Sequence, residues 1–162
     1  MKTDNLEKLW MEELKDLYDA EKQITEALPK MASKTETPEL RKAFEDHLRQ
    51  TEQHIQRLEE TFEELDMGTP RKKCKGMQGL LTEGEEMMKE ATEPMTRDAA
   101  LIAAAQKVEH YEMASYGTVI SYAKQLNYED IADKLHQTLE EEKAADEKLT
   151  QIAEDKVNVS AE

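Results

Sequence analysis

The sequence predicts an all-α protein, in which four long helices form two antiparallel hairpins joined by a crossover segment with a short fifth helix. Composition is the first reason: 36% of the 162 residues are charged, 38% are hydrophobic, and only five glycines and four prolines interrupt the chain. This is typical of proteins built from long helices. Apolar residues also recur at alternating steps of three and four along four long segments. The length suits one domain, residues 1–162, with its own core.

The first half of the chain predicts helices over residues 4–33 and 38–65. The apolar seam of the first helix reads Trp10, Leu14, Leu17, Glu21, Ile24, Leu28 and Met31. The seam of the second reads Phe44, Leu48, Thr51, Ile55, Leu58, Phe62 and Leu65. Between them, Thr37 is a preferred N-cap residue and Pro38 suits the first helical position. The short connection predicts an antiparallel hairpin.

The second half predicts a short helix over residues 77–91 and long helices over 97–126 and 129–153, followed by a polar, irregular tail, 154–162. The seam of the first long helix here reads Ile102, Ala105, Glu109, Glu112, Tyr116, Val119, Ala123 and Leu126. The seam of the last reads Ile131, Leu135, Thr138, Glu142, Ala145, Leu149 and Ile152. The segment before these two helices is too long for a tight turn, so we expect it to cross between the hairpins.

A weak internal repeat relates the two hairpins. Residues 17–21 align with residues 108–112 at an offset of 91, and the same offset places Thr51 against Glu142. Two similar hairpins that face each other form a pseudo-symmetric bundle. Ferritin-like proteins use this arrangement to surround a central dinuclear metal site.

Four glutamates occupy seam positions where apolar residues are expected: Glu21, Glu109, Glu112 and Glu142. A carboxylate buried without a partner costs on the order of several kcal/mol. Each could instead pair with a lysine or tyrosine, and the run of residues 140–143 could be a solvated face. Because three helices aim carboxylates at one seam, however, a shared metal cluster is the explanation that we favour.

Hairpin geometry places some of these carboxylates at one level. A turn near residue 127 makes Glu112 a neighbour of Glu142 and sets Glu109 beside Asp146. Facing helices lie ~8–10 Å apart, so glutamates from both sides can reach one cation. Oxygen ligands suit iron, manganese, magnesium or calcium, and a histidine nitrogen would favour iron or manganese.

The second helix is the least certain contributor of ligands, because Thr51 stands where the repeat predicts an acid. We expect the missing ligand from Glu52 first, from His47 second, or from neither. His54 and His110 are expected at the surface or behind the ligands. Tyrosines one turn from the seam glutamates, Tyr18 and Tyr116, are expected either to hydrogen-bond a ligand carboxylate or simply to pack in the core.

The net charge of −15 makes nucleic acids and anionic membranes poor partners. The chain has one cysteine, Cys74, so an intramolecular disulfide is impossible. We find neither an apolar run of membrane-spanning length nor a leader segment near Met1. A soluble cytoplasmic protein is the resulting expectation.

Several strings in the helices resemble one family. They are AEKQ (20–23), HL (47–48) with Thr51, RDAALIAAAQKVEHYE (97–112), YG (116–117) and LEEEKA (139–144). The chain resembles the YciF/YciE family of bacterial ferritin-like stress proteins over nearly its full length. This resemblance implies a ferritin-like four-helix bundle with a crossover helix, a homodimer, a di-metal centre, and links to general, osmotic or oxidative stress.

The broader ferritin-like pattern is Glu, then Glu-x-x-His, then Glu, then Glu-x-x-His. By this resemblance the four Glu positions are filled by Glu21, Glu52, Glu112 and Glu142. The two His positions hold Ile55 and Ala145, which cannot bind metal. Glu109 with Asp146 would replace one nitrogen ligand, and His47 the other.

Two functions from different classes remain. The first is a di-iron or di-manganese protein that handles peroxide, oxygen or iron, with oxidoreductase or peroxide-scavenging activity. The alternative is a non-enzymatic dimeric binding or scaffold protein, which the missing histidine ligands favour. An iron-storage cage and a nucleic-acid-binding role have less support, because no shell contacts are recognisable and the charge is strongly negative.

Overall fold

A computed structural model describes residues 3–162, and this part of the chain is helical without strands, as predicted. The long helices are α1 (Leu6–Lys34), α2 (Pro38–Glu64), α4 (Pro94–Gln125) and α5 (Glu129–Ile152), and the shorter α3 spans Lys75–Glu90. A π-helical turn, η1 (Ala153–Val157), and the short α6 (Asn158–Ser160) end the chain. These bounds differ from the predicted ranges by a few residues, except at the carboxyl end.

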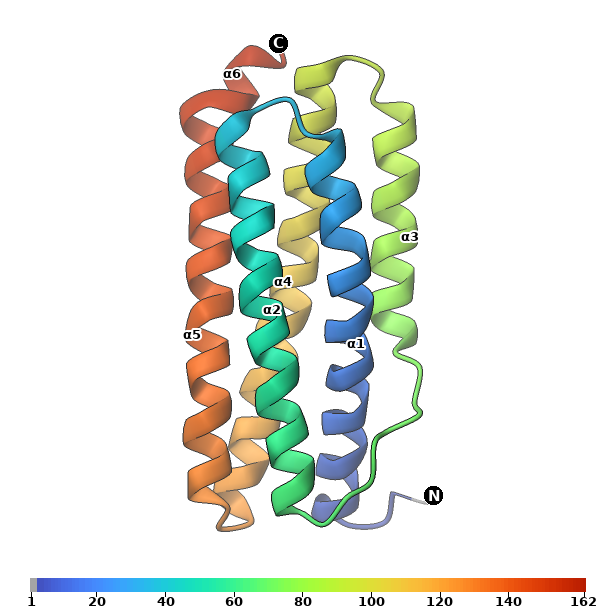
Figure 1. Ribbon diagram of the computed structural model, residues 1–162, viewed down its shortest axis with the longest axis vertical. Helices are drawn as coiled ribbons and strands as arrows, with labels where there is room; N and C mark the ends of the chain where they lie inside the picture. Colours follow the sequence, from blue (N-terminus) through green and yellow to red (C-terminus); the bar gives the residue numbers. More distant parts are fainter. Residues whose placement is uncertain (1–2) are drawn as a thin grey trace.

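The four long helices form an elongated bundle of two antiparallel hairpins, α1–α2 and α4–α5 (Figure 1). Helix α1 packs against α2 and α4, whereas α5 packs against α4 and α2, so α1 and α5 lie on a diagonal. After α2 the chain runs from one end of the bundle to the start of α3, which packs on the outside of α1 and α4 (Figure 1). Because of this crossover, the turns of the two hairpins lie at opposite ends of the bundle.

Helix boundaries follow from local capping chemistry. The Asn5 side chain accepts a hydrogen bond from the Lys8 amide at 2.9 Å and so caps α1. Prolines open α2 and α4, where a missing amide hydrogen costs nothing. Asn127, with φ of 64°, turns the chain between α4 and α5, a conformation that asparagine tolerates better than most residues.

The turn of the first hairpin is fastened to the second hairpin by Asp98. This fully buried side chain, in the first turns of α4, accepts hydrogen bonds from the Glu36 amide at 3.0 Å and the Thr37 amide at 2.7 Å. Both amides belong to the α1–α2 turn. The two hairpins therefore meet at a fixed axial position.

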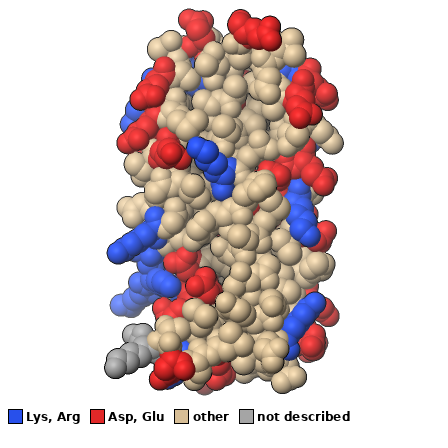
Figure 2. Space-filling model, turned by 180° about the vertical axis from the view of Figure 1, so that it is seen from behind, with Lys and Arg blue, Asp and Glu red and all other residues tan. Residues whose placement is uncertain are grey.

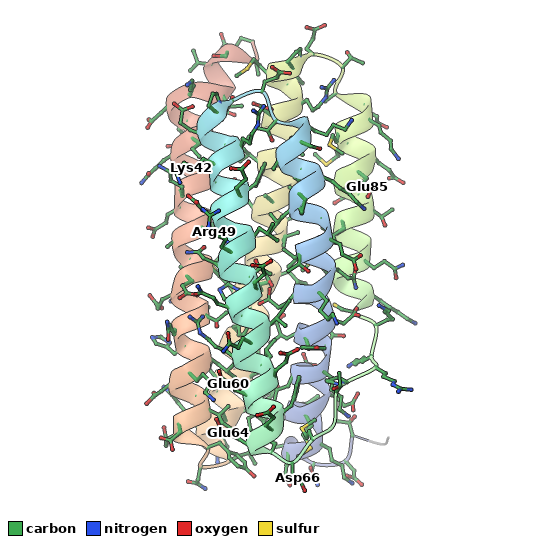
Figure 3. The ribbon with its side chains drawn as sticks, viewed as in Figure 1. Lys42, Arg49, Glu60, Glu64, Asp66 and Glu85 are labelled. Carbon is green, nitrogen blue, oxygen red and sulfur yellow. The ribbon has the colours of Figure 1, made fainter. Side chains whose placement is uncertain are left out.

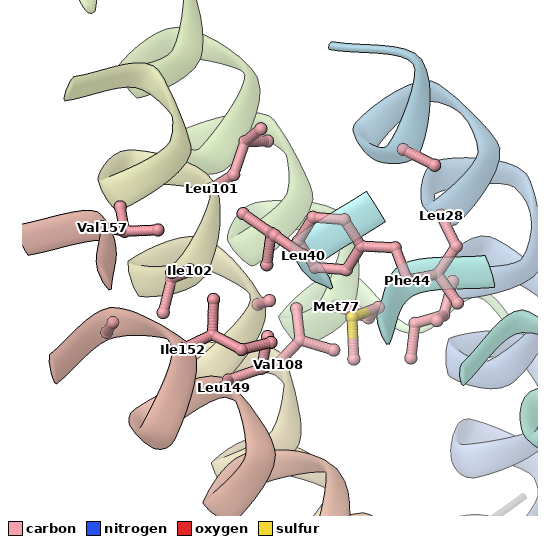
Figure 4. Close-up of a cluster of buried hydrophobic side chains, with 14 of the residues drawn as sticks. Leu28, Leu40, Phe44, Met77, Leu101, Ile102, Val108, Leu149, Ile152 and Val157 are labelled. Atoms are coloured by element: carbon pink, nitrogen blue, oxygen red, sulfur yellow. The ribbon is translucent and has the colours of Figure 1, made fainter. Parts of the chain in front are cut away.

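The carboxyl-terminal tail is ordered, contrary to the expectation of an irregular polar segment. After Ile152 the chain makes the π-helical turn, which keeps Ala153 and Val157 on the bundle side. Val157 is fully buried among Leu101, Ile102 and their neighbours (Figure 4). A π-helical turn contains one more residue than an α-helical turn, so it changes which side chains face the bundle. Ala153 and Val157 can therefore both be buried although polar residues separate them.

Two hydrophobic clusters fill the bundle, one towards each end. The cluster near the α1–α2 turn is drawn in Figure 4 and includes Leu28, Leu40, Phe44, Met77, Leu101, Ile102, Val108, Leu149, Ile152 and Val157. The other includes Trp10, Leu14, Leu17, Leu58, Phe62, Tyr116, Val119, Ile131 and Leu135. Between them lies a belt of buried polar side chains.

Candidate metal centre

Six acidic and imidazole side chains converge in this belt, at the centre of the bundle. One group of potential ligands, the His47 group, has donor atoms that all lie within 4.8 Å of one another: His47, Glu109, Glu112 and Glu142. A second, the His54 group, meets the same limit: Glu21, His54 and Glu142. We call the six residues together the carboxylate–histidine cluster. None of its members is more than 5% exposed.

Glu142 belongs to both groups and connects them. Its Oε1 lies 2.9 Å from Nδ1 of His54, and its Oε2 lies 3.4 Å from Nε2 of His47. Each carboxylate oxygen thus faces a different imidazole. A carboxylate in this position has the geometry to bridge two cations.

Helical spacing brings the remaining ligands to the same level. On α2, His47, Thr51 and His54 follow steps of four and three and share one face. The small Thr51 side chain is fully buried and donates a hydrogen bond to its own helix, at the His47 carbonyl (2.8 Å). It therefore leaves room between the two histidines. On α4, Glu109 and Glu112 share a face in the same way.

Unsatisfied donor and acceptor atoms indicate that the cluster fits a cation. Ten buried side-chain nitrogen or oxygen atoms lack a hydrogen-bond partner within residues 3–162, and eight of them belong to the cluster. They include both oxygens of Glu112 and both of Glu142. Such atoms are costly when left unpaired and are rare in native proteins. Divalent metal ions would satisfy them together.

Without a cation, the cluster has to hold protons. Burial, and then repulsion from Glu142 and Glu21, raises the pKa of Glu112 well above its usual value. Burial likewise raises the pKa of Glu109 to about 7 and that of Glu142 to about 8. Metal binding would replace these protons.

His54 and Glu21 behave as an ion pair inside this acidic environment. Burial alone would lower the pKa of His54, but the carboxylates of Glu21 and Glu142 outweigh it and raise that pKa to about 11. Burial would raise the pKa of Glu21, yet the His54 charge holds it below the usual value. The positive charge of the protonated imidazole therefore partly balances the carboxylates in the absence of a metal ion.

Residues around the cluster orient its ligands. Nε2 of His54 lies 2.8 Å from Oε2 of Glu141, whose carboxylate also accepts two hydrogen bonds from Arg57, at 2.7 and 3.0 Å. Tyr116 donates a hydrogen bond to Oε1 of Glu21 at 2.5 Å. A carboxylate behind a histidine fixes the ring orientation and leaves the other nitrogen, here Nδ1, to face a metal.

The structure brings five of the seven sequence-predicted ligands together and leaves two outside. Glu52 is exposed on α2 and belongs to neither group. Asp146 is half-buried and lies 3.1 Å from the exposed His110, whose surface position agrees with the expectation. It also accepts a hydrogen bond from Gln106 (3.2 Å). Neither acid reaches the cluster directly.

His54 is the potential ligand that sequence reasoning missed. The predicted seam of α2 ran through Leu48 and Ile55, which are only half-buried, whereas the neighbouring histidines, His47 and His54, are buried. The other seam residues Phe44, Thr51, Leu58 and Phe62 are buried as predicted, so the seam differs at the two positions next to the histidines. The spacing of seven residues between the histidines, with Thr51 midway, was the available signal.

The sequence comparisons agree with this architecture. A family model described as a domain of unknown function, DUF892, matches residues 5–162. The chain belongs to the DUF892 family. It is also 48% identical to Protein YciF of Escherichia coli (strain K12), over 100% of this chain and 97% of that protein, which confirms the predicted family resemblance.

Solved structures of similar proteins share the fold. The crystal structure of the E. coli stress protein YciF superposes with a TM-score of 0.92 at 46% identity, covering 96% of this chain and 99% of that one. YcfI of Rhodopseudomonas palustris gives 0.91 at 39% identity, with 94% and 99% covered. A protein from Xanthomonas campestris pv. campestris shares the fold, with a TM-score of 0.77 at 23% identity, over 96% and 95%. No helix within residues 3–162 is long and apolar enough to cross a membrane.

Proposed function

We propose that this protein is a ferritin-like stress protein whose carboxylate–histidine cluster holds two iron or manganese ions and handles peroxide, oxygen or iron. The single observation that carries the proposal is the convergence of six buried acidic and imidazole side chains in two adjoining groups, whose potential ligand atoms lie within 4.8 Å of one another in each group. Carboxylate oxygens with imidazole nitrogens suit iron and manganese. The similarity to E. coli YciF, described as a stress protein, supports the physiological setting.

The ligands would divide between two positions. Glu142, whose two oxygens face His54 and His47, would contribute to both. Glu21 with His54 would complete one position, and Glu109 with His47 the other, while Glu112 lies within reach of the second. Two adjacent redox-active ions would supply electrons to, or accept them from, oxygen or peroxide. The protein would contribute fixed ligands and the exclusion of bulk water by both hydrophobic clusters.

The scaffold alternative has lost the observation that favoured it. That alternative depended on missing histidine ligands, and both His47 and His54 direct a ring nitrogen into the cluster. A purely structural role also leaves the unpartnered carboxylates of Glu112 and Glu142 unexplained. Metal-dependent chemistry is therefore the better-supported function.

Elemental analysis of protein purified without added metal tests the proposal. We expect about two iron or manganese ions per chain, followed by consumption of peroxide or oxidation of Fe(II) by the loaded protein. The double variant Glu112→Gln with Glu142→Gln should lose both, whereas Glu52→Gln is a matched control on an exposed side chain. A metal-free protein whose stability does not respond to Fe(II) or Mn(II) would contradict the proposal.

We also propose that the protein acts in the cytoplasm as a homodimer and does not bind nucleic acid. The net charge of −15 supports the statement that the protein does not bind nucleic acid. The single, buried cysteine supports the cytoplasmic location. A largely uncharged strip runs along the face seen in Figure 2, with charges mostly at its margins, and suits contact with a second copy. Sedimentation velocity would measure the oligomeric state, and a monomer would contradict the dimer.

A further inference from the structure

A pocket of about 450 Å³ opens between α2 and α5 and leads to one side of the carboxylate–histidine cluster. We call it the α2–α5 pocket. Its inner end is lined by His47 and Glu109, both nearly fully buried. Nε2 of His47 lies 3.0 Å from Oε1 of Glu109, and Oε2 of Glu109 lacks a hydrogen-bond partner within residues 3–162. The pocket therefore ends on polar atoms that are available to a ligand or to a metal ion.

The walls of the pocket are apolar and leave unfilled space. Phe44 and Leu149 face it from α2 and α5, and alanines on three helices, Ala43, Ala105 and Ala145, line it where larger side chains would close it. Small-molecule sites are typically concave, about 300–1,000 Å³, mostly apolar and marked by a few polar groups. This pocket has each of these properties and falls near the lower end of that range.

The mouth of the pocket carries charges of both signs, with Lys42 and Lys148 balanced by Glu39 and Asp46. Lys42 lies on the upper part of α2 (Figure 3) and pairs with Asp46 at 2.7 Å. Lys148, on α5, lines the same pocket and has no carboxylate within 4 Å among the described residues. Because the two lysines balance the two acids, the opening itself does not repel an incoming anion.

We propose that the α2–α5 pocket binds a short-chain monocarboxylate whose carboxylate end faces His47 and Glu109 and whose hydrocarbon chain lies along the apolar walls. This inference rests on the proposed function, because the buried glutamates would repel an anion in the metal-free protein. Two divalent cations would neutralise the four glutamate charges, and a carboxylate oxygen suits iron or manganese. The site thus selects an organic acid by charge at one end and by apolar shape along its length.

Isothermal titration calorimetry with hexanoate and Mn(II)-loaded protein tests the proposal. We expect binding to the loaded protein, none to the metal-free protein, and roughly fifteenfold weaker binding of butanoate, since each buried CH2 contributes about fourfold. Ala145→Phe should fill the pocket and abolish binding with the manganese content unchanged. Ala114→Phe, at an exposed position of α4, is the matched control.

A second measurement does not depend on how the variants fold. Carbon-13 relaxation of hexanoate in the presence of the Mn(II)-loaded wild type should be fastest at the carboxylate carbon and slowest at the methyl carbon. Equal binding of hexanoate to metal-free protein, a reversed relaxation order, or no binding to protein shown to contain manganese would overturn the inference. Failure of the protein to take up manganese would instead overturn the proposed function.

Discussion

The two groups of ligands in the carboxylate–histidine cluster are built differently. In the His54 group, each terminal ligand has a supporting partner: Glu141 stands behind His54, and Tyr116 donates to Glu21. In the His47 group, the only support for the ring among residues 3–162 is Gln50, whose Oε1 lies 3.3 Å from Nδ1 of His47. A neutral amide at that distance orients an imidazole less firmly than a carboxylate at 2.8 Å.

The two groups also differ in their access to solvent. His54 and Glu21 are fully buried, whereas His47 and Glu109 line the α2–α5 pocket. The comparison shows that a pseudo-symmetric bundle can hold two candidate metal positions that differ in ligand support and in access to solvent. We expect the His54 position to hold its metal permanently and the His47 position to meet the substrate.

The largest effect is expected where the two groups join. Glu142→Gln removes the carboxylate shared by both groups, so both positions should lose metal together. We expect elemental analysis to fall from about two ions per chain to none. Glu52→Gln should retain both ions. Loss of only one ion from the Glu142 variant would show that the two positions do not depend on a common bridge.

The next effect is expected at the His54 position alone. Glu141→Gln weakens the support behind His54, and loss of such a partner typically costs 10–100-fold in metal affinity. Competition with a chelator should therefore show one weakened site and one unchanged site. Gln50→Ala, the equivalent change behind His47, should have a smaller effect. Equal losses in both variants would remove the proposed difference between the groups.

A pH dependence separates the metal-free from the metal-loaded protein. The pKa values of Glu109 (about 7) and Glu142 (about 8) lie above the ordinary value of 4.5. The folded protein therefore binds these protons more tightly than the unfolded chain. The stability that this provides is complete below pH 4.5 and is lost as the pH rises through 7 and 8. His54, raised to about 11 from 6.5, acts in the same direction above pH 6.5.

The free energy of unfolding of the metal-free protein should therefore fall between about pH 5 and pH 8, by on the order of 1.4 kcal/mol per pH unit for each proton involved. Urea titrations at several pH values measure this slope. In the loaded protein the metal ions replace the protons, and the slope should largely disappear. An unchanged slope on metal loading would show that the metal binds elsewhere.

The smallest effect on metal content is expected from Tyr116→Phe. This change removes one hydrogen bond to the Glu21 carboxylate and keeps the ring that packs near His54. A hydrogen bond to a charged group contributes roughly 1.5–3 kcal/mol. Thermal unfolding should show this loss, with two metal ions retained. Loss of a metal ion would mean that Tyr116 is needed to hold Glu21 as a ligand.

The fold could be predicted because its signals are local and repeated. Apolar steps of three and four, the proline at the start of α2 and the asparagine before α5 each indicate the same helices. The tail was mispredicted because burial of Val157 depends on a π-helical turn that shifts the apolar phase. Nothing in the polar residues 154–156 signals that shift.

The candidate ligands differ in how visible they are in the sequence. Glu109 and Glu142 stand out because each interrupts an otherwise apolar seam. Helix α2 is more polar, so Leu48 and Ile55 were assigned to its seam in place of the buried histidines next to them. Whether His54 is buried depends on the rotation of α2 against α5, which is a property of tertiary packing.

Asp98 has a consequence that reaches well beyond its own turn. Its hydrogen bonds to the amides of Glu36 and Thr37 hold one hairpin level with the other, and the ligands come from both hairpins. A slip of a single residue along a helix moves a side chain by about 1.5 Å and turns it by ~100°. Asp98 thus fixes the axial position of one hairpin against the other and keeps Glu109 opposite His47. It does so from a distance, because Asp98 lies roughly three helical turns from Glu109, the nearest candidate ligand on α4.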